Sequence, residues 1–172
     1  MKYPSLIASN ATQTFALPGG AEVVVPKCNA HFKKWKGVMP QNTYGGKQAL
    51  DLDGNPLFAE LVVLRLFQNE GWQGVWVDTY GKKYRVGLPD LIEPVELPSA
   101  EANIVIGIAS RAGGFKGCWD VFLWKGDEHM FVELKRASKD AIRETQERWL
   151  EASLDLGFPS DAFLVVEWDT EQ

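Results

Sequence analysis

The feature that most constrains the fold is a pair of apolar runs separated by two turn-forming residues. The runs are WDVFLW (119–124) and HMFVELK (129–135), each of strand length, and Gly126-Asp127 lies between them. Glycine at the first central position suits a two-residue hairpin turn. We therefore predict an antiparallel β-hairpin in which Lys125 pairs with Glu128.

This register brings acidic residues together. Opposed positions in an antiparallel pair have residue numbers of constant sum, so Asp120 faces Glu133, and their Cβ atoms should lie about 4.5–5.5 Å apart. Strand alternation puts Glu133 and Lys135 on one face and Leu134 on the other. Two carboxylates this close repel each other unless a cation lies between them, and such oxygen ligands suit Mg²⁺ or Mn²⁺. A one-residue bulge at the turn would remove Asp120 from the shared face.

An exposed face of ion pairs is the alternative interpretation of the hairpin. Exposed pairs are common and contribute only about 0–1 kcal/mol each. However, a face selected for stability would place unlike charges opposite each other, whereas Asp120 opposite Glu133 is a destabilising like-charge pair. We therefore favour a functional site at this end of the hairpin.

Length and composition indicate a folded protein rather than a disordered one. The chain has 172 residues, 45% of them apolar, with 7 Trp and 9 Phe, which is enough for a substantial core. The net charge of −5 disfavours a protein that simply coats DNA. It is compatible with a metal-dependent enzyme, because clustered carboxylates lower the net charge and a bound cation restores positive potential locally.

Cysteine usage and hydropathy bear on location. Cys28 and Cys118 fit no metal-binding or redox spacing, so we expect ordinary thiols in a reducing cytoplasm. The N-terminal residues contain no apolar targeting core, and no stretch approaches a membrane span. We therefore expect a soluble cytoplasmic protein with no membrane partner.

The first fifty residues are expected to form an N-terminal β-hairpin extension, with a second domain over residues 51–172. Phe15 to Pro26 predicts a hairpin whose second strand stops at Pro26. Basic and aromatic residues then alternate up to Lys36, a pattern that can bind phosphates and bases. We favour a solvated face for this run, and residues 37–54 look like a connector.

Two helices carry polar residues on faces that should point inward. Asn55 and Pro56 favour a helix start, and the helix should end at Gly71. Glu60 lies in its apolar stripe, where a carboxylate must either be paired or coordinate a metal. A later helix is predicted over 142–156, with Gln146 on its inner face as either a core amide or a site residue.

The remaining elements are strands and one ambiguous segment. Strands are predicted over 74–80 and 162–168, and residues 88–98 contain three prolines and should form an irregular loop. Residues 100–110, capped by Ser99, favour a short helix, although their Ile and Val content also suits a strand.

With Glu60, Asp120, Glu133-Leu134-Lys135 and Gln146 in this order, residues 56–168 resemble the PD-(D/E)XK nuclease superfamily. Members place an Asp on one strand and Glu-x-Lys on the next. The segment with Gln146 ahead of an aromatic-apolar pair is most similar to the VRR-NUC branch, although the chain has Trp-Asp in place of Pro-Asp and lacks the Val-Arg-Arg triple.

The resemblance implies a restriction-endonuclease-like α/β fold: a helix, a three-strand meander, a helix and a strand, with a central mixed sheet flanked by helices. It also implies a metal-dependent nuclease, most simply a DNA endonuclease that is possibly structure-specific and homodimeric. Asp120, Glu133, the Leu134 carbonyl and Glu60 would bind Mg²⁺ or Mn²⁺, Lys135 would activate water, and Gln146 would hold Lys135 or the water.

Nucleic acid would be gripped by basic residues around that site, and strong salt dependence of binding would follow if several act. The candidates are Lys33, Lys34, Lys36, Arg111, Lys116, Lys139 and Arg143. Two alternatives stay open: a catalytically silent relative that binds nucleic acid or a partner protein, and a sugar-phosphate or nucleotide hydrolase with the same metal ligands.

Overall fold

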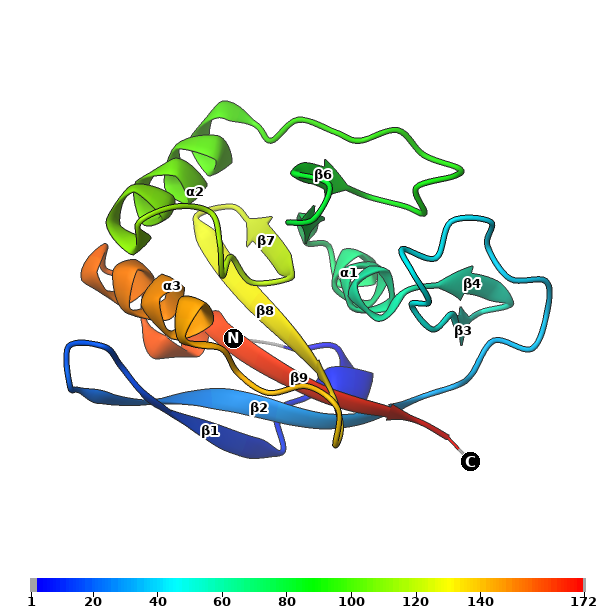
Figure 1. Cartoon of the computed structure of the whole chain (residues 1–172), viewed down its shortest axis with the longest axis horizontal. Coiled ribbons are helices and arrows are strands. Elements are labelled where there is room, and N and C mark those ends of the chain that lie inside the picture. Colours follow the sequence, from blue (N-terminus) through cyan, green and yellow to red (C-terminus); the bar gives the residue numbers. More distant parts are fainter. Residues whose placement is uncertain (1–2, 172) are drawn as a thin grey trace.

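A computed structural model describes residues 3–171 and shows a mixed α/β protein with a central seven-stranded sheet flanked by helices (Figure 1). The strands lie in the order β1-β2-β9-β8-β7-β5-β6. The expected mixed α/β architecture is therefore confirmed. The helices are α1 (Ala59–Asn69), α2 (Ser99–Ala112) and α3 (Glu144–Asp155), with short 3-10 turns at Ser5–Ile7 and Ser160–Ala162.

The sheet contains both parallel and antiparallel pairs. β2 runs parallel to β9 and β9 runs parallel to β8, whereas β8, β7, β5 and β6 are antiparallel in succession, and β1 pairs antiparallel with β2. A separate two-stranded hairpin joins β3 to β4. The strands are β1 (Ala11–Ala16), β2 (Glu22–Phe32), β3 (Leu50–Leu52), β4 (Asn55–Leu57), β5 (Gln73–Asp78), β6 (Lys83–Arg85), β7 (Val121–Lys125), β8 (Glu128–Arg136) and β9 (Phe163–Thr170).

The hairpin of β7 and β8 has the register that its sequence predicted. Lys125 pairs with Glu128, and the pairing continues without a bulge to Val121 opposite Val132. Gly126 has φ of +58°, as the first central position of such a turn requires. The turn chemistry therefore sets the alternation of β8, with Leu134 on one face and Glu133 on the other.

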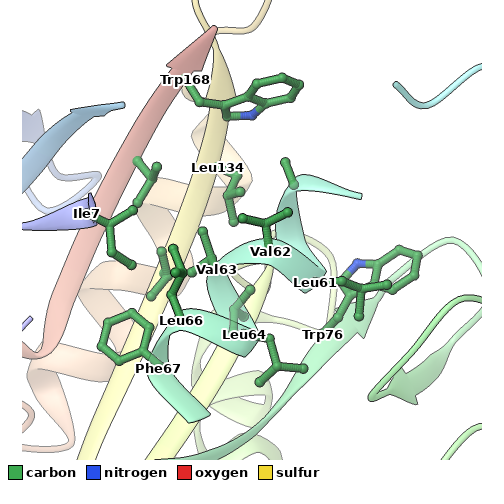
Figure 2. Packing of buried hydrophobic residues seen from close by; sticks show 14 of the residues in the cluster. Ile7, Leu61, Val62, Val63, Leu64, Leu66, Phe67, Trp76, Leu134 and Trp168 are labelled. Carbon is green, nitrogen blue, oxygen red and sulfur yellow. The ribbon is translucent and has the colours of Figure 1, made fainter. Parts of the chain in front are cut away.

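Each face of the sheet has its own core. α1 covers one face, and Figure 2 shows its side chains, among them Val62 and Leu64, gathered with Leu134 of β8. α2 and α3 lie together on the opposite face, where Val105 and Trp149 pack with Phe131. A sheet buried on both faces excludes water from its central strands, so any charge placed there costs free energy unless it is paired.

Two expected boundaries were wrong because strand pairing overrides local preference. β2 does not stop at Pro26 but continues to Phe32. The strand tolerates Pro26 because its pairing with β9 begins only at Lys27, so the missing N–H lies beside a single neighbour. Asn55 and Pro56 do not begin the helix: both belong to β4, and α1 begins at Ala59.

The segment with mixed preferences, Ser99–Ala112, is a helix that ends at Gly113 in the left-handed conformation. Residues 88–98 form the expected irregular loop, apart from one isolated bridge at Val95. Among residues 3–171, no helix has both the length and the apolar character needed to cross a membrane.

Candidate active site

Asp120 lies immediately before β7 and is fixed to both neighbouring strands. Its backbone carbonyl accepts a hydrogen bond from the amide of Val77 in β5, at 2.8 Å. Its carboxylate Oδ2 accepts a hydrogen bond from the amide of Leu134 in β8, at 2.9 Å. Asp120 thus lies one residue outside the paired part of the hairpin, with its carboxylate held at the backbone that follows Glu133.

Glu133, Lys135 and Gln146 form a closed network on the face of the sheet covered by α3. The Lys135 ammonium lies 2.9 Å from Oε1 of Glu133 and donates to Oε1 of Gln146 at 3.0 Å. The Gln146 amide nitrogen donates to the same Glu133 oxygen at 2.5 Å. Glu133, Lys135 and Gln146 are only 1%, 8% and 9% exposed. The network is therefore shielded from water, which strengthens its internal electrostatic interactions.

The start of α3 explains why Gln146 takes this position. Its side-chain Oε1 also accepts a hydrogen bond from the backbone amide of Arg143, at 3.0 Å, which satisfies a free donor at the helix N-terminus. The same oxygen therefore closes the first turn of α3 and holds Lys135. Gln146 is thus a buried amide with both polar atoms satisfied, and its two side-chain partners in β8 are the titratable residues Glu133 and Lys135.

Glu133 keeps one carboxylate oxygen without a partner. Oε2 is buried and accepts no hydrogen bond from any of residues 3–171. Burial first, and then the charge of Asp120, raises the pKa of Glu133 well above its ordinary range. Burial and the charge of Glu60 raise the pKa of Asp120 to about 6. Asp120 therefore lies within electrostatic reach of both Glu133 and Glu60.

Glu60 reaches this group from the first turn of α1, where the helix N-terminus favours a negative charge. It is 7% exposed and forms an ion pair with Lys47. Such an ion pair is one of the two ways in which an inward-facing carboxylate can be stabilised, the other being a metal. Its partner, however, is a flexible lysine from a loop rather than a core residue, and Lys47 retains 37% side-chain exposure.

Lys47 is the site residue that the sequence did not reveal. It follows Gly45-Gly46 in the turn-rich connector, where there is no helix or strand periodicity to indicate which way a side chain points. Its ammonium lies 5.5 Å from the ring centroid of Trp76. Burial would lower the pKa of Lys47, but the charges of Glu60 and Asp120 outweigh that effect and raise it.

The donor chemistry of these residues fits a hard divalent cation. Carboxylate oxygens are the ligands that Mg²⁺ and Mn²⁺ prefer, and Oε2 of Glu133 is a buried oxygen with no other bond in residues 3–171. Within the same residues, no group of three or more His, Cys, Asp or Glu side chains is arranged so that it could hold a metal ion.

A cavity of about 320 Å³ adjoins the acidic group. Lys47, Glu60 and Leu134 form one part of its wall, and Arg136 and Lys139 form another. The guanidinium of Arg136 lies over the ring of Trp168, 5.5 Å from its centroid. Glu60 and Asp140 are the acidic residues of its wall, so the cavity places three cations beside two carboxylates, one of which belongs to the acidic group.

The other basic residues predicted to bind nucleic acid lie outside this cavity. All seven candidates are exposed, and Lys33 forms a 2.9 Å ion pair with Asp51. Lys139 is the one that lines the cavity. The others are Lys34 and Lys36 in the loop after β2, Arg111 at the end of α2, Lys116 in the loop before β7, and Arg143 at the start of α3.

Comparison of the chain with protein-family models, with curated proteins and with solved structures gave no match.

Proposed function

We propose that this protein is a metal-dependent nuclease that hydrolyses phosphodiester bonds in DNA. The observation that carries the proposal is the buried network of Glu133, Lys135 and Gln146 beside Asp120, with one carboxylate oxygen left unpartnered. A network built only for stability would be expected to satisfy every buried polar atom. Within residues 3–171, Trp149 Nε1 and Arg136 Nε are also unpartnered, but the unpaired oxygen of Glu133 belongs to a carboxylate beside Asp120, which supports a cation as its partner.

The order of elements supports assignment to the PD-(D/E)XK nucleases. α1 is followed by the antiparallel strands β5, β7 and β8, then by α3 and by β9 parallel to β8. This order matches the core of that superfamily, with α2 and β6 inserted before β7. The position of Gln146 on the helix after Lys135 favours the VRR-NUC branch.

Each residue then has a defined role. Asp120, Glu133, Glu60 and the Leu134 carbonyl would hold Mg²⁺ or Mn²⁺, which supplies Lewis-acid stabilisation of the charge that develops at phosphorus. Lys135, held by Glu133 and Gln146, would orient the attacking water and contribute positive charge to the transition state. Gln146 would fix the position of the Lys135 ammonium by accepting a hydrogen bond from it, so that Glu133 is not its sole partner.

The test is DNA cleavage by the wild type and by Lys135→Met, which keeps the length of the side chain but removes its charge. Branched, single-stranded and plasmid DNA would be incubated with Mn²⁺ in parallel with mononucleotides. Lys125→Met is the matched control, because Lys125 lies at the turn end of the same hairpin and, within residues 3–171, its ammonium bonds only the carbonyl of Glu70, at 2.7 Å.

We expect cleavage by the wild type and the control, and a loss of at least about 100-fold in Lys135→Met. Equal cleavage by Lys135→Met would refute the assignment of Lys135. Mn²⁺ binding without cleavage of any substrate would favour a catalytically silent binder, and hydrolysis confined to mononucleotides would favour a nucleotide hydrolase. Dimer formation on branched DNA would be read from the same samples by light scattering.

A further inference from the structure

Lys47 occupies a position at the site that the proposed catalytic set does not use. Its ammonium is paired with Glu60 and lies over Trp76, while its side chain also lines the 320 Å³ cavity. It therefore stands between the carboxylate group and the space where an anion would bind. A long side chain with a strongly hydrated ammonium can move between such neighbours by rotamer changes alone.

The loop that carries Lys47 is fastened to the sheet rather than loose. The Lys47 amide donates to the carbonyl of Thr43 at 2.7 Å, closing a turn. The Tyr44 hydroxyl donates to Oδ2 of Asp78 at 2.8 Å. The ring of Tyr44 meets Trp76 edge-on at 5.8 Å. The backbone at Lys47 is thereby positioned, and the freedom that remains is in its side chain.

Asp78 itself is a prepared anchor for this loop. Asp78 is a buried residue, 4% exposed. Besides the hydrogen bond from Tyr44, its Oδ2 accepts one from Nε of Arg85 at 3.0 Å. Its other oxygen accepts from the amide of Gly81 at 2.8 Å. Both carboxylate oxygens of Asp78 already accept hydrogen bonds from these partners. The ion pair with Glu60 therefore determines the position of the Lys47 ammonium.

Charge balance decides what this arrangement does when a cation arrives. A divalent ion at Glu60 and Asp120 repels an ammonium that shares the same Glu60 carboxylate. Because Lys47 lines the adjoining cavity, its side chain can turn toward that space, where Arg136 and Lys139 provide positive charge beside Asp140. With the metal in place at Glu60, three cations would face the single remaining carboxylate of the cavity wall, that of Asp140.

We propose that Lys47 is a phosphate-binding residue that Glu60 holds until a metal binds. The metal displaces the ammonium from Glu60, and the released ammonium holds a nucleic-acid phosphate in the cavity. Metal and phosphate would thus assist each other through one side chain, and such coupling is reciprocal by thermodynamic necessity. The role of the phosphate as substrate rests on the proposed nuclease function, whereas the competition at Glu60 does not.

The experiment uses the full chain and two binding measurements that need no cleavage. Mn²⁺ alone would be titrated by calorimetry into the wild type, Lys47→Met, Lys47→Arg and the control Lys125→Met. Because Lys47→Met removes the competing charge, we expect it to bind Mn²⁺ about 5- to 30-fold more tightly than the wild type. Lys47→Arg should restore wild-type affinity, and Lys125→Met should not change it.

The second measurement is binding of a fluorescein-labelled oligothymidylate with and without Ca²⁺. We expect Ca²⁺ to raise the affinity of the wild type, and the increase to be reduced at least about fivefold in Lys47→Met. Unchanged or weaker Mn²⁺ binding by Lys47→Met, or an undiminished Ca²⁺ effect, would overturn the proposal, as would a wild type that binds no Mn²⁺. Thermal melts identify any variant that fails to fold, in which case Lys47→Gln replaces Lys47→Met.

The two proposals can fail separately. If the wild type binds Mn²⁺ but cleaves no substrate, the nuclease assignment falls, and the displacement of Lys47 is still decided by the calorimetry. If the wild type cleaves DNA but Lys47→Met binds Mn²⁺ no more tightly, the nuclease assignment stands and the role of Lys47 is rejected.

Discussion

Replacing Asp120 with Asn should make the protein more stable at neutral pH. The folded state raises the pKa of Asp120 from its ordinary value of 3.8 to about 6, by burial and by the charge of Glu60. A rise of about two pH units corresponds to about 3 kcal/mol that the folded protein loses when the carboxyl ionises. Because Asp120 keeps some contact with solvent, screening reduces this to about 1–2 kcal/mol.

The sign follows from proton linkage. A carboxyl whose pKa is raised on folding holds its proton more tightly in the folded state than in the unfolded chain. Its cost is therefore absent below about pH 4 and complete above about pH 6, so wild-type stability falls across that window. Asn at position 120 can still accept the 2.9 Å hydrogen bond from the Leu134 amide, which leaves the backbone anchor in place.

The assay is urea unfolding followed by tryptophan fluorescence at pH 4.5 and pH 7.5, with the chain's 7 Trp as reporters. We expect Asp120→Asn to exceed the wild type by about 1–2 kcal/mol at pH 7.5, or about 2–8 °C in Tm for a chain of this size, and to gain little at pH 4.5. Asp127→Asn, at the exposed turn of the same hairpin, should change stability by less than about 0.5 kcal/mol.

The opposite result would refute the reasoning. A less stable Asp120→Asn at pH 7.5 would mean that the Asp120 charge is satisfied by its surroundings. An equal gain at both pH values would show that ionisation is not the cause. Added Mn²⁺ should stabilise the wild type and close the gap to the variant, because ligand binding to the folded state raises its stability.

Two further substitutions test the elements that position the site. Gln146→Ala should lower the free energy of unfolding by about 1–3 kcal/mol in urea titrations, because it removes the amide that donates to Glu133, and Gln146→Glu should not restore the loss. Gly117→Ala should be more damaging still, since its Cβ would lie 2.1 Å from the Thr145 carbonyl oxygen at φ of +96°. Gly126→Ala, where nothing lies within 4 Å, should cost only about 1 kcal/mol despite its positive φ; equal losses for the two glycines would contradict this account.

Much of the candidate site could be predicted from the local sequence of the β7–β8 hairpin. The Gly126-Asp127 turn sets the register of β7 and β8, and that register alone separates Leu134 from Glu133 and Lys135. The contact of Asp120 could not be derived in the same way. Its ladder ends one residue earlier, so the Asp120 side chain bonds the Leu134 backbone instead of simply facing a neighbour across the hairpin.

Helix periodicity was equally informative about polar residues. Glu60 and Gln146 both interrupt apolar stripes, and both are buried where α1 and α3 meet the sheet. What periodicity cannot supply is the identity of their partners. Gln146 bonds to β8, on the preceding element, whereas Glu60 pairs with Lys47 from a connector that has no periodic pattern at all.

The misplaced boundaries have a common physical origin. Asn55-Pro56 has the preferences of a helix start, yet the Asp53-Gly54 turn, with φ of +53° and +78°, folds it back on β3. An Asp-Gly pair between Leu-rich segments is a strong hairpin signal. It outweighs the helix-start preference of Asn55-Pro56, because the helix can begin a few residues later instead. The predicted strand end at Pro26 was wrong for a similar reason. Pairing of Lys27 and the following residues with β9 continues the strand beyond the proline.

The change in unfolding free energy when single residues of the site are neutralised distinguishes a structural network from a binding site. A structural network should become less stable when any member is neutralised, because each removal leaves a buried partner unpaired. A ligand site without its ligand should become more stable when a repelled carboxylate is neutralised, since function there opposes stability. Gln146, which satisfies its neighbours, and Asp120, which is repelled by them, should therefore respond in opposite directions. Opposite signs at two residues of one cluster are not expected from an ion-pair face, and they would mark the Asp120 end as the place where a cation belongs.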